Sequence, residues 1–318
     1  MINYHDILQA RENIANFMNE TPVLHSSKLS EICGNEMYFK AEHLQKTGSF
    51  KIRGAANKVK KTVRDGVTFV TAASSGNHGQ AVAYIANQLG IQATIVIPVD
   101  ANESKKNAIK SYRGNIEKCG TTSAERLPKA RELAIEHNGT FIPPYDDPFI
   151  MAGQGTIGLE ILEQLEDVDI IVVPIGGGGL ISGILTAIKQ TKPKVKIIGV
   201  EPATANDTFL SLKNKKITAI RATTTIADGL RTSQPGDMTF PIVQKYLDDL
   251  VLVSDEEIKV AQSFVLERMK QLIEPSSAVT VAAAMNGKLG IKDKKVVCVL
   301  SGGNVDIRNL GSTTIQRV

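Results

Sequence analysis

The stretch IIVVPIGGGGL, residues 170–180, is a continuous apolar run that leads directly into four glycines. An apolar run without alternating polar residues predicts a strand that helices cover on both faces. The residues that follow, 180–190, have the pattern of a helix. A strand, a glycine turn and a helix in this order are typical of an α/β fold in which the strands are mostly parallel.

The same alternation of strands and helices extends over the rest of the chain. Further strands are expected at residues 37–40, 67–72, 93–97, around 116, 140–142, 195–200 and 295–300. Further helices are expected at residues 6–19, 51–63, 79–89, 103–112, 123–137, 158–165 and 254–273. The alternation predicts mostly parallel, twisted sheets flanked by helices.

The chain has 318 residues, which is more than one typical domain contains, so two domains are expected. Pro143-Pro144 marks the point where a compact middle segment returns to the rest of the chain. We therefore expect a large domain of residues 1–67 and 145–318, and a small domain of residues 68–144.

The composition excludes several classes of protein. Hydrophobic residues make up 42% and charged residues 22%, as in ordinary globular proteins. The net charge is only +4 and aromatic residues are 5%, so no nucleic-acid partner is expected. We expect neither a signal peptide nor a membrane span, because no apolar run is long enough. The three cysteines, Cys33, Cys119 and Cys298, are far apart and predict a reduced, cytoplasmic setting.

A lysine lies among two glycines and two hydroxyls in the stretch TGSFKIRG, residues 47–54. A lysine amine becomes a nucleophile only when burial or a neighbouring cation lowers its pKa. Phe50 and Ile52 could supply the burial around Lys51, and Arg53 could supply the charge. The alternative is that Lys51 is a solvated surface lysine, as most lysines are.

The four glycines are candidates for an anion site. Backbone amides at a turn before a helix bind phosphate, helped by the helix dipole. A dinucleotide site is an alternative, because Glu201 lies where a ribose-binding acid would be. The third glycine of that motif is missing, since Ile181 or Ser182 stands in its place. The loop therefore predicts a site for a single phosphate.

Two further loops follow apolar strands and carry hydroxyls and amides: SSGNHG, residues 74–79, and SGGN, residues 301–304. The first offers a good set of donors for a carboxylate. His78, taken alone, is more typical of a structural histidine. A lysine amine, a phosphate site and hydroxyl-rich loops at strand ends together suggest pyridoxal phosphate held as a Schiff base.

These motifs, in order along the chain and together with GQGTIG at residues 153–158, resemble the serine/threonine dehydratase and serine racemase family. The resemblance implies a two-domain, fold-type II pyridoxal-phosphate enzyme like the β-subunit of tryptophan synthase. It implies deamination of L-serine to pyruvate and of L-threonine to 2-oxobutyrate, with release of ammonia and some serine racemisation. It also implies a homodimer.

The resemblance assigns roles to single residues. Lys51 would hold the cofactor and abstract the Cα proton, and Ser75 would act from the opposite face of the ring. The cofactor-binding residues would be Phe50, Lys51, Asn77, Gly176, Gly177, Gly178, Gly179 and Ser301. The substrate-binding residues would be Ser74, Ser75, Asn77 and Gly229.

A divalent-metal loop is also implied by the resemblance. Glu201 and Asp207 would bind Mg²⁺ or Ca²⁺, with Mn²⁺ as a further candidate, through their carboxylates, and Ala205 through its backbone carbonyl. The sequence Glu274-Pro275-Ser276-Ser277 resembles the racemase-like members.

Several alternatives remain open from the sequence. Serine racemisation could be the main activity, or the substrate could be 3-hydroxyaspartate, whose second carboxylate Arg126 could bind. Two alternatives belong to other functional classes: a nicotinamide-dependent oxidoreductase, and an inactive binding protein with the same fold.

Overall fold

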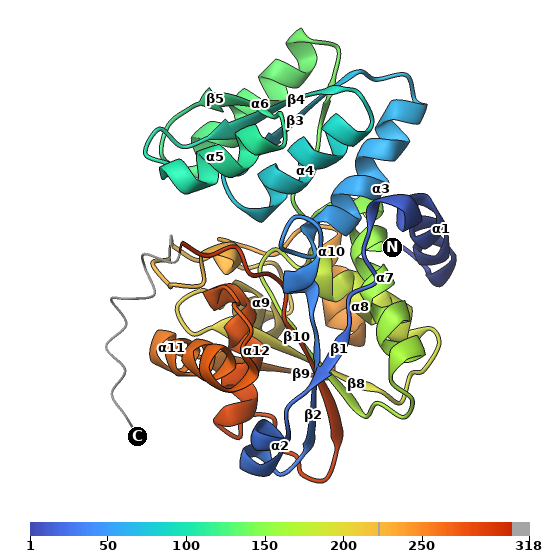
Figure 1. The fold of residues 1–318 in the computed structure, drawn as a ribbon, viewed down its shortest axis with the longest axis vertical. Helices are drawn as coiled ribbons and strands as arrows, with labels where there is room; N and C mark the ends of the chain where they lie inside the picture. Colours follow the sequence, from blue (N-terminus) through green and yellow to red (C-terminus); the bar gives the residue numbers. More distant parts are fainter. Residues whose placement is uncertain (222, 307–318) are drawn as a thin grey trace.

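The computed structural model describes residues 1–221 and 223–306, which form two sheets flanked by helices (Figure 1). The larger sheet has the strand order β1-β2-β10-β7-β8-β9, and only the β1–β2 pair is antiparallel. Its strands are Val23–His25 (β1), Glu36–Lys40 (β2), Ile170–Pro174 (β7), Lys196–Pro202 (β8), Asp249–Val253 (β9) and Lys295–Val299 (β10). The mostly parallel α/β class is therefore confirmed.

The smaller sheet is wholly parallel, with the order β5-β4-β3-β6. Its strands are Phe69–Ala73 (β3), Gln92–Ile97 (β4), Asn115–Lys118 (β5) and Thr140–Phe141 (β6). All four strands come from one continuous segment, whereas the larger sheet is built from the chain before and after it. The exact domain limits, 68–144 for the small domain and 1–67 with 145–318 for the large one, stay a prediction.

Twelve α-helices surround the sheets within the described residues. They are Tyr4–Ile14 (α1), Ser27–Cys33 (α2), Lys51–Arg64 (α3), Asn77–Gln88 (α4), Glu103–Ser111 (α5), Ser123–Glu136 (α6), Pro148–Gln164 (α7), Gly179–Lys189 (α8), Asp207–Asn214 (α9), Thr239–Tyr246 (α10), Asp255–Phe264 (α11) and Pro275–Met285 (α12). None of the described helices is both long and apolar enough to cross a bilayer.

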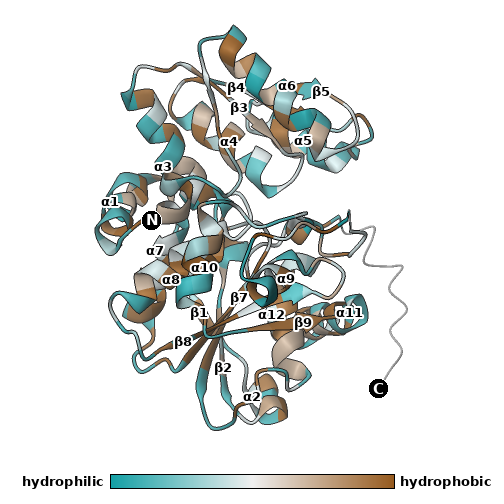
Figure 2. Cartoon of the chain, turned by 180° about the vertical axis from the view of Figure 1, so that it is seen from behind, coloured by the Kyte–Doolittle hydropathy of each residue, from teal (hydrophilic) through white to brown (hydrophobic). Residues whose placement is uncertain are grey.

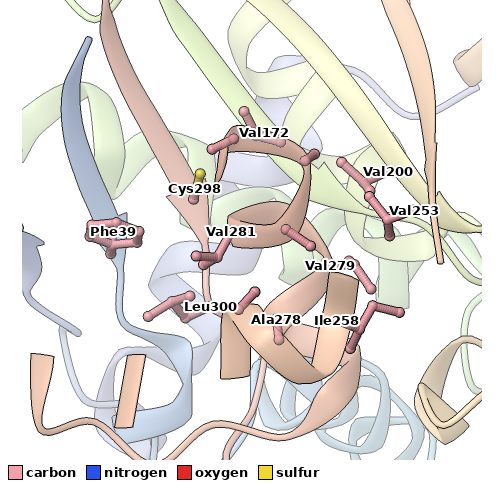
Figure 3. Close-up of a cluster of buried hydrophobic side chains, with 14 of the residues drawn as sticks. Phe39, Val172, Val200, Val253, Ile258, Ala278, Val279, Val281, Cys298 and Leu300 are labelled. Atoms are coloured by element: carbon pink, nitrogen blue, oxygen red, sulfur yellow. The ribbon is translucent and has the colours of Figure 1, made fainter. Parts of the chain in front are cut away.

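Both faces of the larger sheet are apolar, because alternate residues of each strand point to opposite sides. On one face Val172 and Cys298 pack with α11 and α12, as Figure 3 shows. On the other face Val173 and Val297 pack with α7, α8 and α10. Apolar colouring accordingly runs along the inner strands in Figure 2, and the outer helices carry both hydrophilic and hydrophobic colouring. Because helices cover both faces of the sheet, its inner strands are uninterrupted apolar runs in the sequence.

Helix α3 packs on both parts of the molecule. Ile52, Ala56 and Val59 belong to the apolar cluster of the smaller sheet, which α4 also joins. The opposite side of α3 meets α7 so closely that a Cβ at Gly153 would lie 2.6 Å from the backbone oxygen of Arg53. The first residue of α3 is Lys51. The lysine is therefore fixed at the junction of the two sheets.

Two expected helix ranges were wrong. The helix predicted at 158–165 begins at Pro148, and Asp147 caps it by accepting hydrogen bonds from the backbone amides of Phe149 and Ile150. Its glycines are required by close helix contacts and do not mark a loop. The helix predicted at 254–273 ends at Phe264, because a π-turn, Val265–Met269, and the left-handed Lys270 follow it.

Candidate active site

A cavity of about 1690 Å³ opens where strands β3, β7 and β10 end. Ligands of open α/β sheets bind at the carboxyl ends of the strands, so its place is the expected one. The cavity brings together the predicted cofactor and substrate residues Phe50, Lys51, Ser74, Ser75, Asn77, Arg126, Gly176, Gly177, Gly178, Gly179, Gly229 and Ser301. Glu201, Ala205 and Asp207 do not line it.

Lys51 is half-buried, and its Nζ donates a hydrogen bond to the backbone oxygen of Pro144 at 2.6 Å. The Phe50 ring lies beside it, with its centre 5.2 Å from Nζ. Burial lowers the pKa of Lys51 to about 8, although the negative charge of Glu274 opposes this shift. A large share of the amine is therefore neutral slightly above neutral pH, which suits a lysine that forms a Schiff base.

Arg53 does not lower the pKa of Lys51, contrary to the expectation from the sequence, because buried carboxylates neutralise its charge. Its Nε and Nη2 each donate to the Glu42 carboxylate at 2.8 Å. Its Nη1 and Nη2 donate to Glu160 at 2.5 and 2.8 Å. Lys40 completes this buried ionic cluster through a 2.5 Å bond to Glu160. The cluster ties the first turn of α3 to α7.

The glycine loop joins β7 to α8 and is packed tightly from behind. Gly178 has a φ of +91°, which favours glycine. A Cβ at Gly177 would lie 2.4 Å from the Tyr145 ring, and one at Gly179 would lie 2.9 Å from the Tyr145 Cβ. The glycines thus let Tyr145 pack against the loop, and they line the cavity at the start of α8, where backbone amides can bind a phosphate.

Asn77 is the first residue of α4, and its amide is bonded at both ends. Its Nδ2 donates to the two oxygens of Glu274 at 2.8 and 3.0 Å. Its Oδ1 accepts from Asn304 Nδ2 at 2.8 Å. Burial raises the pKa of Glu274 to about 7, although the hydrogen bond from Asn77 opposes this shift. The sequence points to Glu274 only within the stretch 274–277 and predicts no role for it in the site, since its partners are distant in sequence.

The remaining cavity residues keep polar groups near the strand ends. The Ser301 and Ser277 hydroxyls are 3.1 Å apart, and the Gly229 amide donates to the Ser276 hydroxyl at 2.9 Å. The Ser74 hydroxyl accepts from the backbone amide of Gly76 at 3.3 Å. Together with Ser75, these groups give the cavity wall a supply of hydroxyls beside the amine of Lys51.

His78 has a structural contact, as its sequence context suggested. Its Nε2 donates to the backbone oxygen of Ile142 at 2.9 Å. Burial, with the positive charge of Lys51, lowers the pKa of this imidazole to about 3, although its hydrogen bond to Ile142 opposes this shift. The neutral ring therefore links the start of α4 to the chain that leaves β6.

Glu201 is the second-last residue of β8 and does not line the cavity. Its carboxylate accepts hydrogen bonds from the backbone amides of Thr208 and Phe209 at 3.0 and 2.9 Å, at the start of α9. A ribose-binding role is therefore wrong for this residue. Burial and the neighbouring Asp207 raise the pKa of Glu201 to about 8. Burial also raises the pKa of Asp207 to about 7.

Two buried carboxylates beside the backbone of Ala205 are a chemically suitable donor set for a hard cation. Among residues 1–221 and 223–306, however, no group of three or more histidine, cysteine, aspartate or glutamate side chains is placed to hold a metal ion. The metal loop therefore stays a prediction.

Comparisons with known proteins agree with this geometry. The model of the family "Pyridoxal-phosphate dependent enzyme" matches residues 14–302. An L-threonine ammonia-lyase of Thermotoga maritima is 44% identical over 308 residues, which cover 96% of this chain and 77% of the relative. A serine racemase of Dictyostelium discoideum is 41% identical, with 97% of each chain covered. The structure of maize serine racemase matches with a TM-score of 0.94 at 37% identity, over 98% of this chain and 96% of that chain.

Proposed function

The chain belongs to the family of pyridoxal-phosphate dependent enzymes, and from this premise we propose that it deaminates L-serine and L-threonine to the keto acid and ammonia. The observation that carries the proposal is the half-buried amine of Lys51 in one cavity with the glycine loop and the hydroxyls of Ser74 and Ser75. The L-threonine ammonia-lyase among the relatives supports deamination, and the serine racemase supports action on the same class of amino acid.

The residues of the cavity fit pyridoxal phosphate. Lys51 would bind its aldehyde carbon, the amides of Gly176 to Gly179 its phosphate, Asn77 its ring oxygen and Ser301 its ring nitrogen. When bound, this cofactor supplies an electron sink for cleavage of the Cα–H bond. Lys51, once the substrate amine has taken its place, would take the Cα proton as general base. That proton would leave with the β-hydroxyl as water, and hydrolysis of the released enamine would yield the keto acid and ammonia.

A direct test uses the purified protein with pyridoxal phosphate. We expect a yellow protein that releases keto acid from L-serine and L-threonine. Keto acid and D-serine are assayed separately, so a larger yield of D-serine would move the main activity to racemisation. A colourless protein that binds no cofactor would contradict the proposal, as would a yellow protein that produces neither compound.

Replacing Ser75 by alanine separates deamination from racemisation. If the Ser75 hydroxyl protonates Cα from the face opposite Lys51, D-serine formation falls by about 100-fold or more, as for loss of a general acid. Deamination of L-serine changes by less than about tenfold, because Lys51 still takes the proton. Chiral analysis of the products checks this, with Ser104→Ala, an exposed serine at the same cavity, as control. An equal fall of both rates would refute a two-base site.

A second candidate function is deamination of 3-hydroxyaspartate, and Arg126 is the observation that favours it. This arginine on α6 lines the cavity, and its Nε and Nη1 are buried without a hydrogen-bond partner among the described residues. A second substrate carboxylate would satisfy both atoms. Each substrate's kcat/KM is compared in the wild type and in Arg126→Gln. We expect a loss of about 10- to 100-fold for hydroxyaspartate alone, the value of a charged hydrogen bond. Equal losses for serine would contradict this role.

We also propose that Glu201, Asp207 and the carbonyl of Ala205 bind Mg²⁺, Ca²⁺ or Mn²⁺. A cation that binds only the folded chain stabilises it by about 2.7 kcal/mol at 100 times its dissociation constant. Thermal unfolding is therefore expected to shift upward when Mg²⁺ or Ca²⁺ is added to the wild type. The shift disappears in Asp207→Asn and persists in Asp65→Asn, a change at an exposed acid. A shift that persists in Asp207→Asn would place the cation elsewhere.

We also propose that the protein is a homodimer in the cytoplasm. All three cysteines are free in the structure, which supports a reducing compartment. The resemblance to dimeric enzymes supports the homodimer, and light scattering of the purified protein tests it.

A further inference from the structure

The amide of Asn77 is held between two partners that fix which way it points. Asn304 Nδ2 donates to the backbone oxygen of Thr47 and to Asn77 Oδ1, both at 2.8 Å. These two bonds use both hydrogens of that nitrogen. On its other side, Asn77 Nδ2 donates to the carboxylate of Glu274 at 2.8 and 3.0 Å.

Only one orientation of the two amides satisfies all of these partners. The Thr47 carbonyl and the Glu274 carboxylate both accept hydrogen bonds in these contacts. If Asn304 were reversed, its oxygen would face the oxygen of Thr47. If Asn77 were reversed, its oxygen would face the carboxylate, and its nitrogen would face the nitrogen of Asn304. The chain of contacts from Thr47 to Glu274 therefore determines the orientation of Asn77.

The loop that carries Asn304 is bound to the loop that carries Lys51. The Phe50 amide donates to the oxygen of Ser301 at 3.0 Å, and the Gly303 amide donates to the oxygen of Gly48 at 2.8 Å. A Cβ at Gly48 would lie 2.4 Å from Asn304 Oδ1, so the Asn304 amide packs directly on this loop. The orientation of the Asn77 amide is thus fixed relative to the backbone next to Lys51.

One N–H of Asn77 remains for a ligand. The two oxygens of one carboxylate are close together, so a single N–H of Nδ2 serves both of them. Asn77, Glu274 and Asn304 all line the cavity. The oxygen of Asn77 is already occupied by Asn304, which leaves Asn77 to act towards a ligand as a donor.

We propose that Asn304 and Glu274 are positioning residues that hold Asn77 as a hydrogen-bond donor to the ring oxygen of the cofactor, and so favour the deprotonated form of that oxygen. This inference rests on the proposed function, because it assumes that the cavity binds pyridoxal phosphate. It goes further in assigning a task to two residues that do not themselves react.

The decisive comparison is Asn304→Asp against Asn304→Leu in the holoenzyme. Aspartate is nearly the same size as asparagine but presents oxygens to the oxygens of Thr47 and Asn77, so Asn77 turns its nitrogen towards it. Leucine removes the bonds without imposing this reversal. A purely structural role predicts that leucine is the more harmful change, whereas the positioning role predicts that aspartate is.

The readouts are the visible spectrum of the bound cofactor as a function of pH and the dissociation constant of pyridoxal phosphate. In Asn304→Asp we expect the apparent pKa of the spectral transition to rise by about one unit, a tenfold change. The cofactor is expected to bind about tenfold more weakly, with a smaller change in Asn304→Leu. Val305→Asp places the same charge one residue away and is expected to have little effect on either readout.

Equal spectra for Asn304→Asp and the wild type would overturn the inference, and so would a larger effect of leucine or of Val305→Asp. Thermal unfolding of each variant without cofactor shows whether it is folded. A wild-type protein that takes up no pyridoxal phosphate would instead refute the proposed function, so the two failures are distinguishable.

Discussion

Replacing Lys51 by alanine is expected to abolish the visible absorption band of the bound cofactor and to reduce ammonia release from L-serine by at least about 10³-fold. Lys51 lines the cavity with a half-buried amine whose pKa is lowered by burial, and its nitrogen is both the proposed point of covalent attachment and the proposed general base. The measurements are the visible spectrum and a keto-acid assay. Lys46→Ala, at an exposed lysine five positions earlier, is the control and should leave both unchanged. Full ammonia release by Lys51→Ala would contradict the mechanism.

The pKa of Lys51 adds a pH dependence to this prediction. Only the neutral amine attacks an aldehyde. When pyridoxal phosphate is added to the protein prepared without it, the rate of covalent attachment should therefore increase as the pH rises. The rate should level off above about 8, because burial lowers the pKa of Lys51 to about 8. A solvated lysine would give a rate that still rises towards about pH 10. Stopped-flow absorbance at a series of pH values distinguishes the two.

Replacing Arg53 by methionine is expected to lower the free energy of unfolding by about 3–5 kcal/mol, the cost of breaking a buried ion pair. Glu42 is fully buried and Glu160 largely so, and both would lose their guanidinium partner. Denaturant unfolding measures the loss. The matched control is Arg11→Met, which removes an exposed bond to Glu163 and should cost less than about 1 kcal/mol. Equal effects of the two changes would contradict the importance of the buried cluster.

Acid should weaken the same cluster. Burial alone would raise the pKa of Glu42, but the charge and hydrogen bonds of Arg53, with Lys40 and Thr21, outweigh it and lower the pKa. A carboxylate whose pKa is lower in the folded state stabilises that state above its unfolded pKa and loses this contribution as the pH falls. The difference in stability between wild type and Arg53→Met should therefore shrink in acid.

The sequence predicts the central part of the fold well because its strands are apolar on both faces. The strand expected at 170–174 has those bounds in the structure, and the expected strands include all of the smaller sheet and the four inner strands of the larger one, but not its edge strands β1 and β9. Helix α12 was missed, because residues 276–284 of Pro275–Met285 are all buried, so the helix has no exposed polar face and lacks a helical periodicity. Strands β1 and β9 lie at the edges of the larger sheet, where their burial pattern is weak.

The candidate site was predictable where the residues follow strands, since the carboxyl ends of parallel strands meet at one edge of a sheet. This reasoning places the loops of Ser75, the glycines and Ser301 together. The same reasoning does not predict contacts between residues that are distant in sequence, such as Arg53 with Glu160 or Asn77 with Glu274. Their side chains belong to common residue types, and only the packing of α3, α4 and α7 reveals the pairs.

The smaller sheet is formed by a segment that lies between α3 and α7 in the sequence, and residues of this segment line the cavity. It carries Ser74, Ser75 and Arg126, whereas Lys51, the glycine loop and Ser301 belong to the surrounding chain. The proposed substrate residues Ser74, Ser75 and Arg126 are thus encoded in a different stretch of the gene from Lys51 and the glycine loop. Transplanting the inserted segment from a relative offers a route to new substrates in which the reactive lysine and its phosphate loop remain untouched.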